Sequence, residues 1–351
     1  MPPLGFGIIG CGVIGPFHAR AIQAAEGAEL VACCDIIPER AEQLAAEFDV
    51  PHTYTDHRDM LARDDVNIVC ICTPSGMHAE QGIACAEAGK HILVEKPIDV
   101  RLDRIDALVQ AAETHGVKLG CIFQMRTYDA SRRTREAVQR GRLGRMVMGD
   151  TYLKYYRSPE YYLSGDWRGT WELDGGGALM NQGVHGIDLL LWVMGPVRRV
   201  TAHADHLVRD IPVEDTAVAI LEYESGAFGV IEGATSVHPG MPTKHEFHGD
   251  RGTIVLREQT IETWEIEGEA KPEQAPPGDT KTAAHGDPTA ISSVGHEFQV
   301  QDMVHAVQQD REPYVPGRDA RRAVECILAI YESARTGQTV ELPLQVPTAR
   351  F

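Results

Sequence analysis

The first 25 residues constrain the fold more than any other stretch of this chain. An apolar run from Leu4 to Ile9 leads into three glycines, Gly10, Gly12 and Gly15, and residues 16–25 then have the apolar spacing of a helix. A strand, a tight turn and a helix in this order begin a parallel α/β sheet, because parallel strands need a crossover between them. The first glycine permits the turn, the second lets a ligand approach the backbone, and the third lets the helix pack on the strand.

A second strand, predicted over Ala28–Cys34, ends at Asp35, 20 residues beyond Gly15. At that distance a carboxylate meets the ribose hydroxyls of a dinucleotide whose pyrophosphate lies at the helix N-terminus. Asp35 favours NAD over NADP, because a carboxylate repels a 2′-phosphate and Ile36 offers that phosphate no donor, although Arg40 is near enough to keep NADP open. The residues expected around this cofactor turn are Gly10, Gly12, Val13, Ile14, Gly15, Asp35, Ile36 and Arg40.

The alternation of strands and helices continues to residue 122 and predicts a doubly wound, parallel sheet. Strand Ile68–Cys72 is followed by Thr73 and Pro74. Ligands of open α/β sheets bind at the carboxyl ends of the strands, so we expect both residues to line the cofactor. His78 follows at the start of the next helix, where a structural role is favoured and a cofactor contact is the alternative.

Strand His91–Val94 delivers Glu95, Lys96 and Pro97 to the same edge of the sheet. An acid, a base and a proline at a strand end form a candidate site at which Glu95 and Lys96 meet the cofactor. Pro97 fixes the backbone, and its peptide bond is a candidate for the cis form, which would turn Lys96 toward the cleft. A surface ion pair between Glu95 and Lys96 is the alternative, weakened because side chains of consecutive residues point apart.

A second informative stretch runs from Gly175 to Trp192, where three glycines lead into a segment with helical spacing. At about 100° per residue, Asn181, His185 and Asp188 fall within roughly 60° of one another, opposite an apolar face. Three polar side chains on one face can converge on a small polar ligand. The alternative is a solvated helix face with a structural histidine.

Composition excludes several classes of partner. The chain has 51 acidic residues against 33 lysines and arginines, a net charge of −18, which argues against nucleic acid. It has no apolar run near the ~20 residues of a membrane span and no signal peptide, so we expect a cytoplasmic protein. The eight cysteines indicate buried thiols in a reducing compartment. His203 with His206, and His245 with His248, face opposite sides of their strands, so no metal site is expected.

The motifs together resemble one known family. They are the glycine turn, Thr73-Pro74, Ala88-Gly89-Lys90-His91 leading to Glu95-Lys96-Pro97, and Gly175-Gly176-Gly177 with Asn181, His185 and Asp188. This combination, spread over almost the whole chain, resembles the glucose-fructose oxidoreductase and inositol dehydrogenase (Gfo/Idh/MocA) family. The resemblance implies an NAD(P)-dependent oxidoreductase of sugars, inositols or their derivatives. It also implies a Rossmann domain, residues 1–122, followed by a substrate-binding and oligomerisation domain, residues 123–351, with a large, mostly antiparallel sheet.

By this resemblance, Lys96 and His185 occupy the catalytic positions, and Asn181 stands where an aspartate is usual. We expect reversible hydride transfer between NAD and a secondary hydroxyl, with His185 taking the hydroxyl proton and Lys96 hydrogen-bonding the same oxygen. Asn181 would orient the imidazole, one helical turn away, without the charge that an aspartate supplies to an imidazolium.

Beyond Phe123 the pattern changes to strands separated by turns rich in glycine and aspartate, with closing helices near Glu297–Gln309 and Asp319–Arg335. Residues 267–289 lack periodicity and are expected to form a mobile surface loop. The mixed outer face of strand Phe228–Thr235 predicts a homodimer or homotetramer through this sheet. Aromatic faces and arginines suit sugars, and the residues expected to bind substrate are Lys96, Gln124, Arg126, Tyr156, Arg157, Trp167, Arg168, Asn181 and His185.

Two other functions stay open at this point. One is an enzyme that keeps its NAD and recycles it within a turnover, as in epimerisation, glycoside cleavage or aldose-ketose coupling. The other is a non-catalytic sensor of dinucleotides or sugars, since a fold does not fix a function. The presence of both Lys96 and His185 argues against a sensor, which needs neither. The sequence leaves the sugar, the oxidised carbon and the direction of the reaction undetermined.

Overall fold

The computed structural model describes residues 2–273 and 293–345. Contacts between Cα atoms divide the chain into two compact units. The first consists of Met1–Gln124 with Ser293–Arg321, and the second of Met125–Ser292 with Arg322–Phe351. Both units are therefore built from two separate stretches of the chain.

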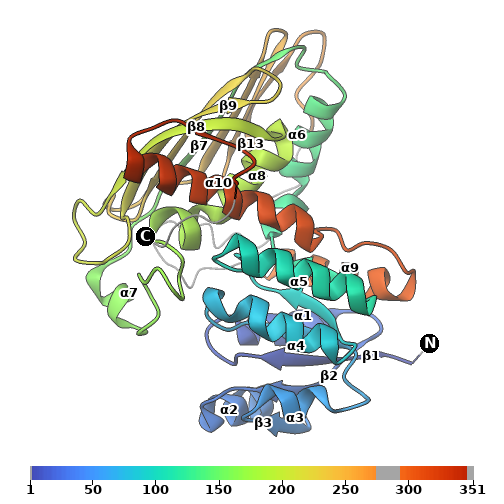
Figure 1. The fold of residues 1–351 in the computed structure, drawn as a ribbon. Helices are drawn as coiled ribbons and strands as arrows, with labels where there is room; N and C mark the ends of the chain where they lie inside the picture. The colour runs from blue at the N-terminus through green and yellow to red at the C-terminus, as the bar shows by residue number, and fades with distance from the viewer. Residues whose placement is uncertain (1, 274–292, 346–351) are drawn as a thin grey trace. The chain divides into compact units, whose positions relative to one another are not determined.

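The first unit is a doubly wound sheet of six parallel strands, which confirms the predicted fold (Figure 1). The strand order is β3-β2-β1-β4-β5-β6, so the order reverses between β1 and β4, the position where such sheets bind ligands. The elements are β1 (Leu4–Ile9), α1 (Gly15–Ala24), β2 (Ala28–Cys34), α2 (Pro38–Phe48), β3 (His52–Tyr54), α3 (His57–Leu61), β4 (Ile68–Ile71), η1 (Ser75–Met77), α4 (His78–Glu87), β5 (His91–Val94), α5 (Leu102–His115), β6 (Leu119–Cys121) and α9 (Val294–Gln308).

Helix α9 belongs to the first unit although it follows the second unit in sequence. Val300, Met303 and Val304 lie at helical positions i, i+3 and i+4 and are buried in one core with Phe6 of β1 and Ile22 of α1. The predicted single division after residue 122 places this helix in the other domain and stays a prediction. In the structure, the apolar stripe of α9 completes the core beside α1.

The second unit contains an eight-stranded, mostly antiparallel sheet, as the sequence predicts. Its order is β13-β12-β11-β7-β10-β9-β8-β14, and β7 with β10 is the parallel pair. The elements are α6 (Asp129–Gln139), β7 (Met146–Lys154), α7 (Pro159–Leu163), η3 (Ala178–Gly183), α8 (Val184–Met194), β8 (Val197–Asp205), β9 (Thr216–Tyr223), β10 (Phe228–Ala234), β11 (Lys244–Gly249), β12 (Gly252–Arg257), β13 (Thr260–Ile266) and β14 (Val340–Glu341), with η2 (Gln124–Thr127) and α10 (Gly317–Thr336) each crossing a unit boundary.

The segment predicted as one helix from the triple glycine onward is a π-helical turn, η3, followed by α8. This corrects the expected spacing between Asn181, in η3, and His185, in α8. At the start of this turn, Glu214 accepts the backbone N–H groups of Gly177 and Leu179 through its carboxylate and that of Ala178 through its carbonyl. Three consecutive donors are thus bonded outside the helix before regular α-helical bonding begins.

Helix α8 lies very close to the sheet. A Cβ atom added at Gly186 would stand 2.5 Å from Leu153 Cδ2 of β7, so a larger residue there would require the Leu153 side chain to move. The opposite face of the sheet is partly apolar, and Val218 and Ile220 of β9 with Phe228 of β10 are exposed there.

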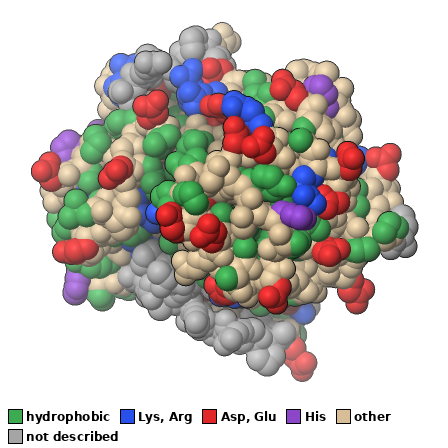
Figure 2. Space-filling view, turned by 90° about the horizontal axis from the view of Figure 1, so that it is seen from below, with side chains coloured by type: hydrophobic (Ala, Val, Ile, Leu, Met, Phe, Trp, Pro, Cys, Tyr) green, Lys and Arg blue, Asp and Glu red, His purple; other side chains and the backbone are tan. Residues whose placement is uncertain are grey.

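No helix among residues 2–273 and 293–345 is long and apolar enough to cross a membrane. On the face drawn in Figure 2, acidic side chains stand among basic and apolar ones across the view, in keeping with the net charge of −18. All eight cysteines are free and buried, which confirms their expected burial. The predicted mobile loop, residues 267–289, lies outside the described residues from position 274 onward.

Candidate active site

The glycine turn between β1 and α1 is closed toward the sheet and open on its other side. Gly10 has a φ of +94°, and a Cβ atom there would lie 2.7 Å from the carbonyl carbon of Cys72. Around a Cβ atom added at Gly12, nothing lies within 4 Å. A ligand phosphate can therefore approach the backbone at Gly12, as the sequence motif requires.

Asp35 closes this turn from the end of β2. Its Oδ2 accepts the Cys11 N–H at 2.8 Å, and its Oδ1 accepts the Ile37 N–H at 2.9 Å. The carboxylate is therefore fixed beside the turn and only 8% exposed. Beside it, Ile36 is 82% exposed and Arg40 is exposed on α2, while Val13 is exposed and Ile14 half-buried in the turn.

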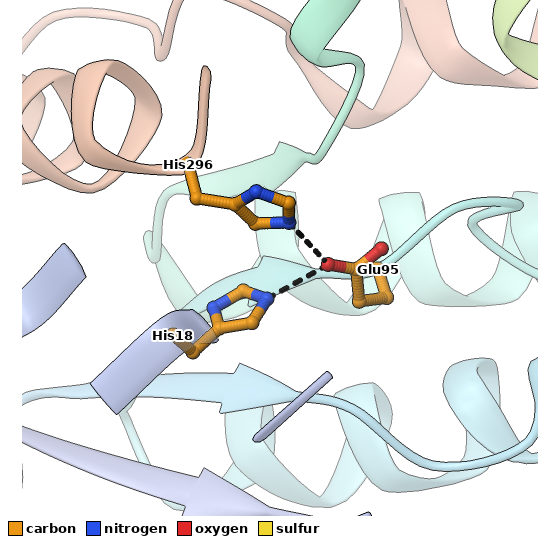
Figure 3. Close-up of side chains that lie close together, drawn as sticks. All are labelled: His18, Glu95 and His296. Atoms are coloured by element: carbon orange, nitrogen blue, oxygen red, sulfur yellow. Dashed lines mark hydrogen bonds and ion pairs between the residues drawn. The ribbon is translucent and has the colours of Figure 1, made fainter. Parts of the chain in front are cut away.

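Glu95, at the end of β5, joins two histidines in a buried network, which we call the Glu95 network (Figure 3). Its Oε1 lies 2.8 Å from His18 Nε2, on α1, and 3.1 Å from His296 Nε2, on α9. Its Oε2 accepts the backbone N–H of Lys96 at 3.2 Å. A carboxylate only accepts hydrogen bonds, so the hydrogen on each imidazole belongs on Nε2.

The charge of Glu95 is set by these partners. Burial acts to raise its pKa, but the hydrogen bonds from His18 and His296 hold the pKa well below its usual value. Burial lowers the pKa of His18, against the influence of Glu95. The network therefore holds an ionised carboxylate between two imidazoles.

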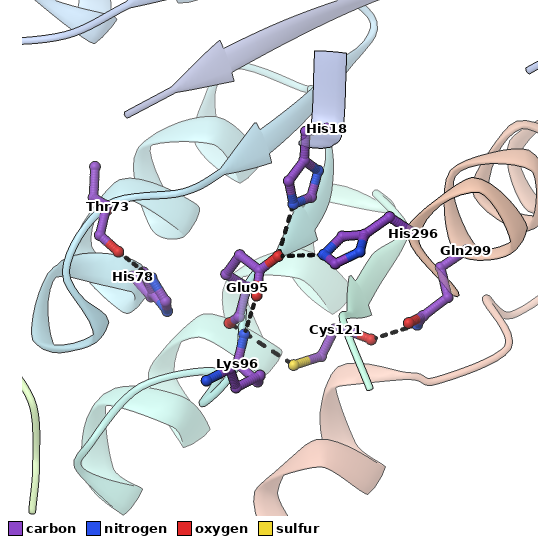
Figure 4. A network of polar contacts seen from close by, with 8 residues as sticks. All are labelled: His18, Thr73, His78, Glu95, Lys96, Cys121, His296 and Gln299. Atoms are coloured by element: carbon purple, nitrogen blue, oxygen red, sulfur yellow. Dashed lines mark hydrogen bonds and ion pairs between the residues drawn. The ribbon is translucent and has the colours of Figure 1, made fainter. Parts of the chain in front are cut away.

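His78 connects two turns at the same edge of the sheet (Figure 4). Its Nε2 lies 2.9 Å from the carbonyl oxygen of Thr73, and its Nδ1 lies 2.8 Å from that of Pro97. Both ring nitrogens thus have partners within the protein, in keeping with a structural role for His78. The Lys96–Pro97 peptide bond is cis, as expected, and Thr73 and Pro74 are half-buried beside it.

In the second unit, the hydroxyl of Tyr161, on α7, is the centre of a half-buried polar cluster. It accepts hydrogen bonds from Arg168 Nη1 at 2.5 Å and from Gln182 Nε2 at 2.8 Å. Gln182 Oε1 in turn accepts from Arg157 Nη2 at 2.8 Å. The guanidinium of Arg168 also lies over the rings of Tyr161 and Trp167, at 4.3 and 4.6 Å from their centroids.

Asn181 lies at the edge of this cluster and contacts a carboxylate that the sequence analysis missed. Its Nδ2 donates to Asp174 Oδ1, and its Oδ1 accepts from Gln182 Nε2 at 3.0 Å. Asp174 is buried and also accepts the N–H of Gly169. Asn181, which stands where the family resemblance leads one to expect an aspartate, is therefore hydrogen-bonded to an aspartate, Asp174. His185 follows, half-buried, at the second position of α8.

The structure gives Arg126 and Asp188 roles other than the predicted ones. Arg126 is 3% exposed and Asp188 is 1% exposed. Two hydrogen bonds of 2.7 and 2.5 Å join the guanidinium to both carboxylate oxygens. Loss of either partner would destabilise the fold, because a buried charge without its partner is costly. The two side chains thus hold each other inside the second unit, and their predicted contacts with a ligand stay predictions.

The remaining predicted substrate residues have these surroundings. Gln124 is half-buried at the start of η2 and packs beside Gly295 of α9. Tyr156 is half-buried, packs edge-on against His238 and lies under the guanidinium of Arg209. Arg157 is buried and donates to the carbonyl of Tyr156. Predicted residues Arg157, Trp167, Arg168 and Asn181 thus belong to one cluster, whereas Gln124 and Lys96 lie in the other unit.

Among the described residues, two groups of His, Asp and Glu side chains have possible metal-ligand atoms close together. One is the Glu95 network, and the other consists of Asp150, Glu246 and His248 on the second sheet. The expectation that the protein uses no metal stays a prediction.

The comparison with family descriptions decides the identity of the fold. Residues 4–123 match "Oxidoreductase family, NAD-binding Rossmann fold", and residues 135–342 match "Oxidoreductase family, C-terminal alpha/beta domain". The chain belongs to the Gfo/Idh/MocA oxidoreductase family. Its first unit is therefore the family's NAD-binding Rossmann domain, and the open backbone at Gly12 with the fixed Asp35 carboxylate fits such a cofactor.

Several members of the Gfo/Idh/MocA family resemble the chain along most of their length. A myo-inositol 2-dehydrogenase of Thermotoga maritima is 28% identical, over 75% of this chain and 79% of its own. A 1,5-anhydro-D-fructose reductase of Ensifer adhaerens is 27% identical, over 96% and 98%. The solved structure of the WlbA dehydrogenase from Bordetella pertussis, in complex with NADH and UDP-GlcNAcA, is 33% identical, with a TM-score of 0.87 over 98% of this chain and 100% of that one.

Proposed function

We propose that the protein oxidises a secondary hydroxyl of a sugar derivative with NAD, and that the preferred substrate carries an anionic group. The observation that carries this proposal is the Tyr161 cluster in a member of an NAD-binding oxidoreductase family. Two accepted hydrogen bonds occupy the lone pairs of the Tyr161 hydroxyl, so its proton is directed to another acceptor. A sugar oxygen supplies such an acceptor.

The arginines of the second unit indicate the anionic group. Arg168 and Arg209 each have a buried Nε–H without a hydrogen-bond partner among the described residues. Neither forms an ion pair with a described carboxylate. Guanidinium groups bind carboxylates and phosphates through two parallel hydrogen bonds, so an anionic substrate satisfies these donors. Similarity to a dehydrogenase whose structure contains UDP-GlcNAcA supports the same class of substrate.

NAD, when bound, supplies the hydride acceptor. We propose His185 as the general base that takes the hydroxyl proton, with Asn181 and Asp174 beside it in the second unit. Lys96 is proposed to hydrogen-bond the reacting oxygen and stabilise the negative charge that develops there. Glu95, Thr73 and Pro74 are proposed to line the cofactor in the first unit, and Asp35 to select NAD over NADP by repelling a 2′-phosphate.

The test is a comparison of substrates with purified protein and NAD. We expect the rate of NADH formation to be highest for UDP-GlcNAcA, lower for UDP-GlcNAc and lowest for myo-inositol. Arg168→Leu should raise KM for the anionic substrate more than Arg168→Lys, because only lysine keeps the charge. Equal effects on a neutral sugar, or preference for myo-inositol, would contradict the anionic assignment. NAD that survives repeated desalting would favour the recycling enzyme instead.

We also propose a homodimer or homotetramer that covers the exposed apolar residues of β9 and β10, namely Val218, Ile220 and Phe228. Exposed apolar side chains that adjoin on one sheet face are typical of an interface between copies. Light scattering should give at least twice the mass of the chain, and Ile220→Lys should shift it toward the monomer. A monomer at micromolar concentration for the unchanged protein would refute the proposal.

A further inference from the structure

The three side chains of the Glu95 network come from three separate segments. His18 lies 77 residues before Glu95, and His296 lies 201 residues after it. Their rings are 5.2 Å apart and nearly perpendicular, at 77°, and both Nε2 atoms converge on the same carboxylate oxygen (Figure 3). The network therefore ties the helix after the cofactor turn, the end of β5 and the start of α9 to one point.

That point adjoins Lys96 through the backbone. The other carboxylate oxygen of Glu95 accepts the Lys96 N–H, and the carbonyl of Glu95 accepts a hydrogen bond from Cys121 Sγ at 3.9 Å. Gln299, one turn beyond His296 on α9, donates to the carbonyl of Cys121 at 2.8 Å (Figure 4). Helix α9 thus contacts the Glu95 carboxylate directly through His296, and it contacts the Glu95 carbonyl indirectly through Gln299 and Cys121.

The distances favour hydrogen bonds over a metal ion at this place. Two ligands of a tetrahedral zinc ion, each about 2.0 to 2.1 Å from it, stand roughly 3.3 Å apart. The His18 nitrogen lies 2.8 Å from the Glu95 oxygen, a normal length for a hydrogen bond and too short for that geometry. His18, His296 and Glu95 are 0%, 1% and 6% exposed.

The second nitrogen of each ring decides the charge. Nδ1 of His18 and Nδ1 of His296 are buried and have no hydrogen-bond partner among the described residues. A second proton on either ring would therefore be buried without an acceptor, which is costly. His18 is therefore neutral, and both imidazoles donate from Nε2 to a carboxylate that keeps its negative charge.

We propose that His18, Glu95 and His296 are positioning residues for Lys96, which fix its backbone and link it to the cofactor turn through α1 and to the C-terminal segment through α9. This inference rests on the proposed catalytic role of Lys96. It assigns no contact with substrate to the three residues. It makes α9, a helix outside the cofactor and polar clusters, a requirement for turnover.

The test compares two substitutions at one position. His296→Gln keeps an N–H donor that reaches Glu95, whereas His296→Leu removes it. We expect His296→Leu to lower kcat about 100-fold, the effect of misplacing a catalytic group by about 1 Å, with KM little changed and NADH binding by fluorescence retained. His296→Gln should restore most of kcat. His305→Leu, at an exposed position of the same helix, is the matched control and should be silent.

Two measurements need no substrate. In the unchanged protein, proton NMR should show two downfield imidazole N–H resonances, both lost in Glu95→Gln. The rate at which an amine reagent labels Lys96, followed by mass spectrometry, should change in His296→Leu but not in His296→Gln or His305→Leu. If no substrate turns over yet this pattern appears, the proposed function fails and the positioning network stands.

Three results would overturn the network. The first is an unchanged kcat and labelling rate in His296→Leu protein that is folded by circular dichroism. The second is equal loss in His296→Gln and His296→Leu. The third is one equivalent of zinc in the purified protein by elemental analysis that is lost in Glu95→Gln, which would make the three side chains metal ligands.

Discussion

Two buried carboxylates hold backbone next to the two residues proposed for chemistry, and they carry charge differently. Glu95 bonds the N–H of Lys96, and Glu214 bonds the N–H groups of Gly177 and Leu179 that precede the helix of His185. The carboxylate of Glu95 accepts hydrogen bonds from two imidazoles as well as from the Lys96 N–H. The carboxylate of Glu214 accepts them from two peptide N–H groups and the hydroxyl of Tyr331. Burial is similar, at 6% and 4% exposed.

The outcome for their charge is opposite. The pKa of Glu95 is held well below its usual value, while burial raises the pKa of Glu214 to about 7 in spite of three accepted hydrogen bonds. The hydrogen bonds that the two imidazoles donate to Glu95 outweigh the effect of burial on its pKa, whereas the peptide and phenol donors around Glu214 do not. Burial therefore does not fix the charge of an acid, and the kind of donor around it decides. Glu95 adds stability that is lost as pH falls, and Glu214 adds stability that is lost as pH rises.

The largest effect should come from substitution of His185, in the helix that follows the turn bonded to Glu214. His185→Ala is expected to reduce the rate of hydride transfer by roughly 100- to 10,000-fold, the usual contribution of a positioned base, and to leave NADH binding nearly unchanged. Single-turnover absorbance at 340 nm with saturating NAD measures it. His203→Ala, an exposed histidine of the same unit, is the control. An unchanged rate would leave Lys96 as the group that handles the proton.

The contrast between the two acids can be tested through stability. The pKa of Glu214 lies about 2.5 units above the usual 4.5, so the folded state keeps a proton that the unfolded state releases between pH 4.5 and 7. This stabilisation, on the order of 3 kcal/mol, is complete below pH 4.5 and is lost as pH rises through 7.

Chemical denaturation at pH 5 and pH 8 measures that loss. Glu214→Gln cannot ionise, so its deficit in unfolding free energy relative to the unchanged protein should be larger at pH 5 than at pH 8. Glu224→Gln, at an exposed position, should show no such change. A deficit that grows with pH would mean that Glu214 is ionised throughout and would remove the contrast with Glu95.

Much of this comparison depends on features that the sequence alone predicts. The glycine turn, the strand ends at Asp35 and Lys96, and the mostly antiparallel second sheet follow from local patterns, because apolar periodicity and glycine positions act within a few residues. His18 had a weak local signal, three residues after Gly15, and Asp174 directly precedes the triple glycine. Neither position showed which partner it would meet.

Other parts depend on contacts across the chain and could not be predicted. His296 meets Glu95 across 201 residues, and only the fold of α9 onto α1 brings them together. The N–H groups at the start of the π-helical turn bond to Glu214, which is 35 to 37 residues away in the sequence, and periodicity cannot show such a contact. Arg126 appeared available for a substrate because its carboxylate partner lies 62 residues away.

A third carboxylate, Asp35, sharpens the comparison because, among the residues that the structure describes, backbone N–H groups alone hold its two oxygens. We expect NAD to bind more tightly than NADP, and Asp35→Ser to narrow the difference by about 1 to 3 kcal/mol, since it removes a like charge beside the 2′-phosphate. Asp35→Asn keeps the shape and should give most of the same change. Fluorescence titration with NADH and NADPH decides, and a tenfold preference of the unchanged protein for NADPH would exclude this role.

The smallest effect should come from a carboxylate introduced at position 181, where the protein has an asparagine. Asn181→Asp adds a second carboxylate beside Asp174, in the turn that precedes the helix of His185. Its negative charge should raise the pKa of His185 and move the acidic limb of the pH profile for oxidation upward, by less than about one pH unit, or 1.4 kcal/mol. A shift in the opposite direction would show that Asn181 does not influence the imidazole.

The first unit includes residues 293–321, and this affects when it can fold during synthesis of the chain. The core beside α1 includes Val300, Met303 and Val304, so the cofactor domain cannot finish folding when its own strands leave the ribosome. It must wait for some 200 more residues, roughly 10 to 40 seconds at common rates of synthesis. During that time an apolar helix face stays uncovered, which is a reason for such a chain to need chaperones. A fragment that ends at residue 122 would keep this defect permanently.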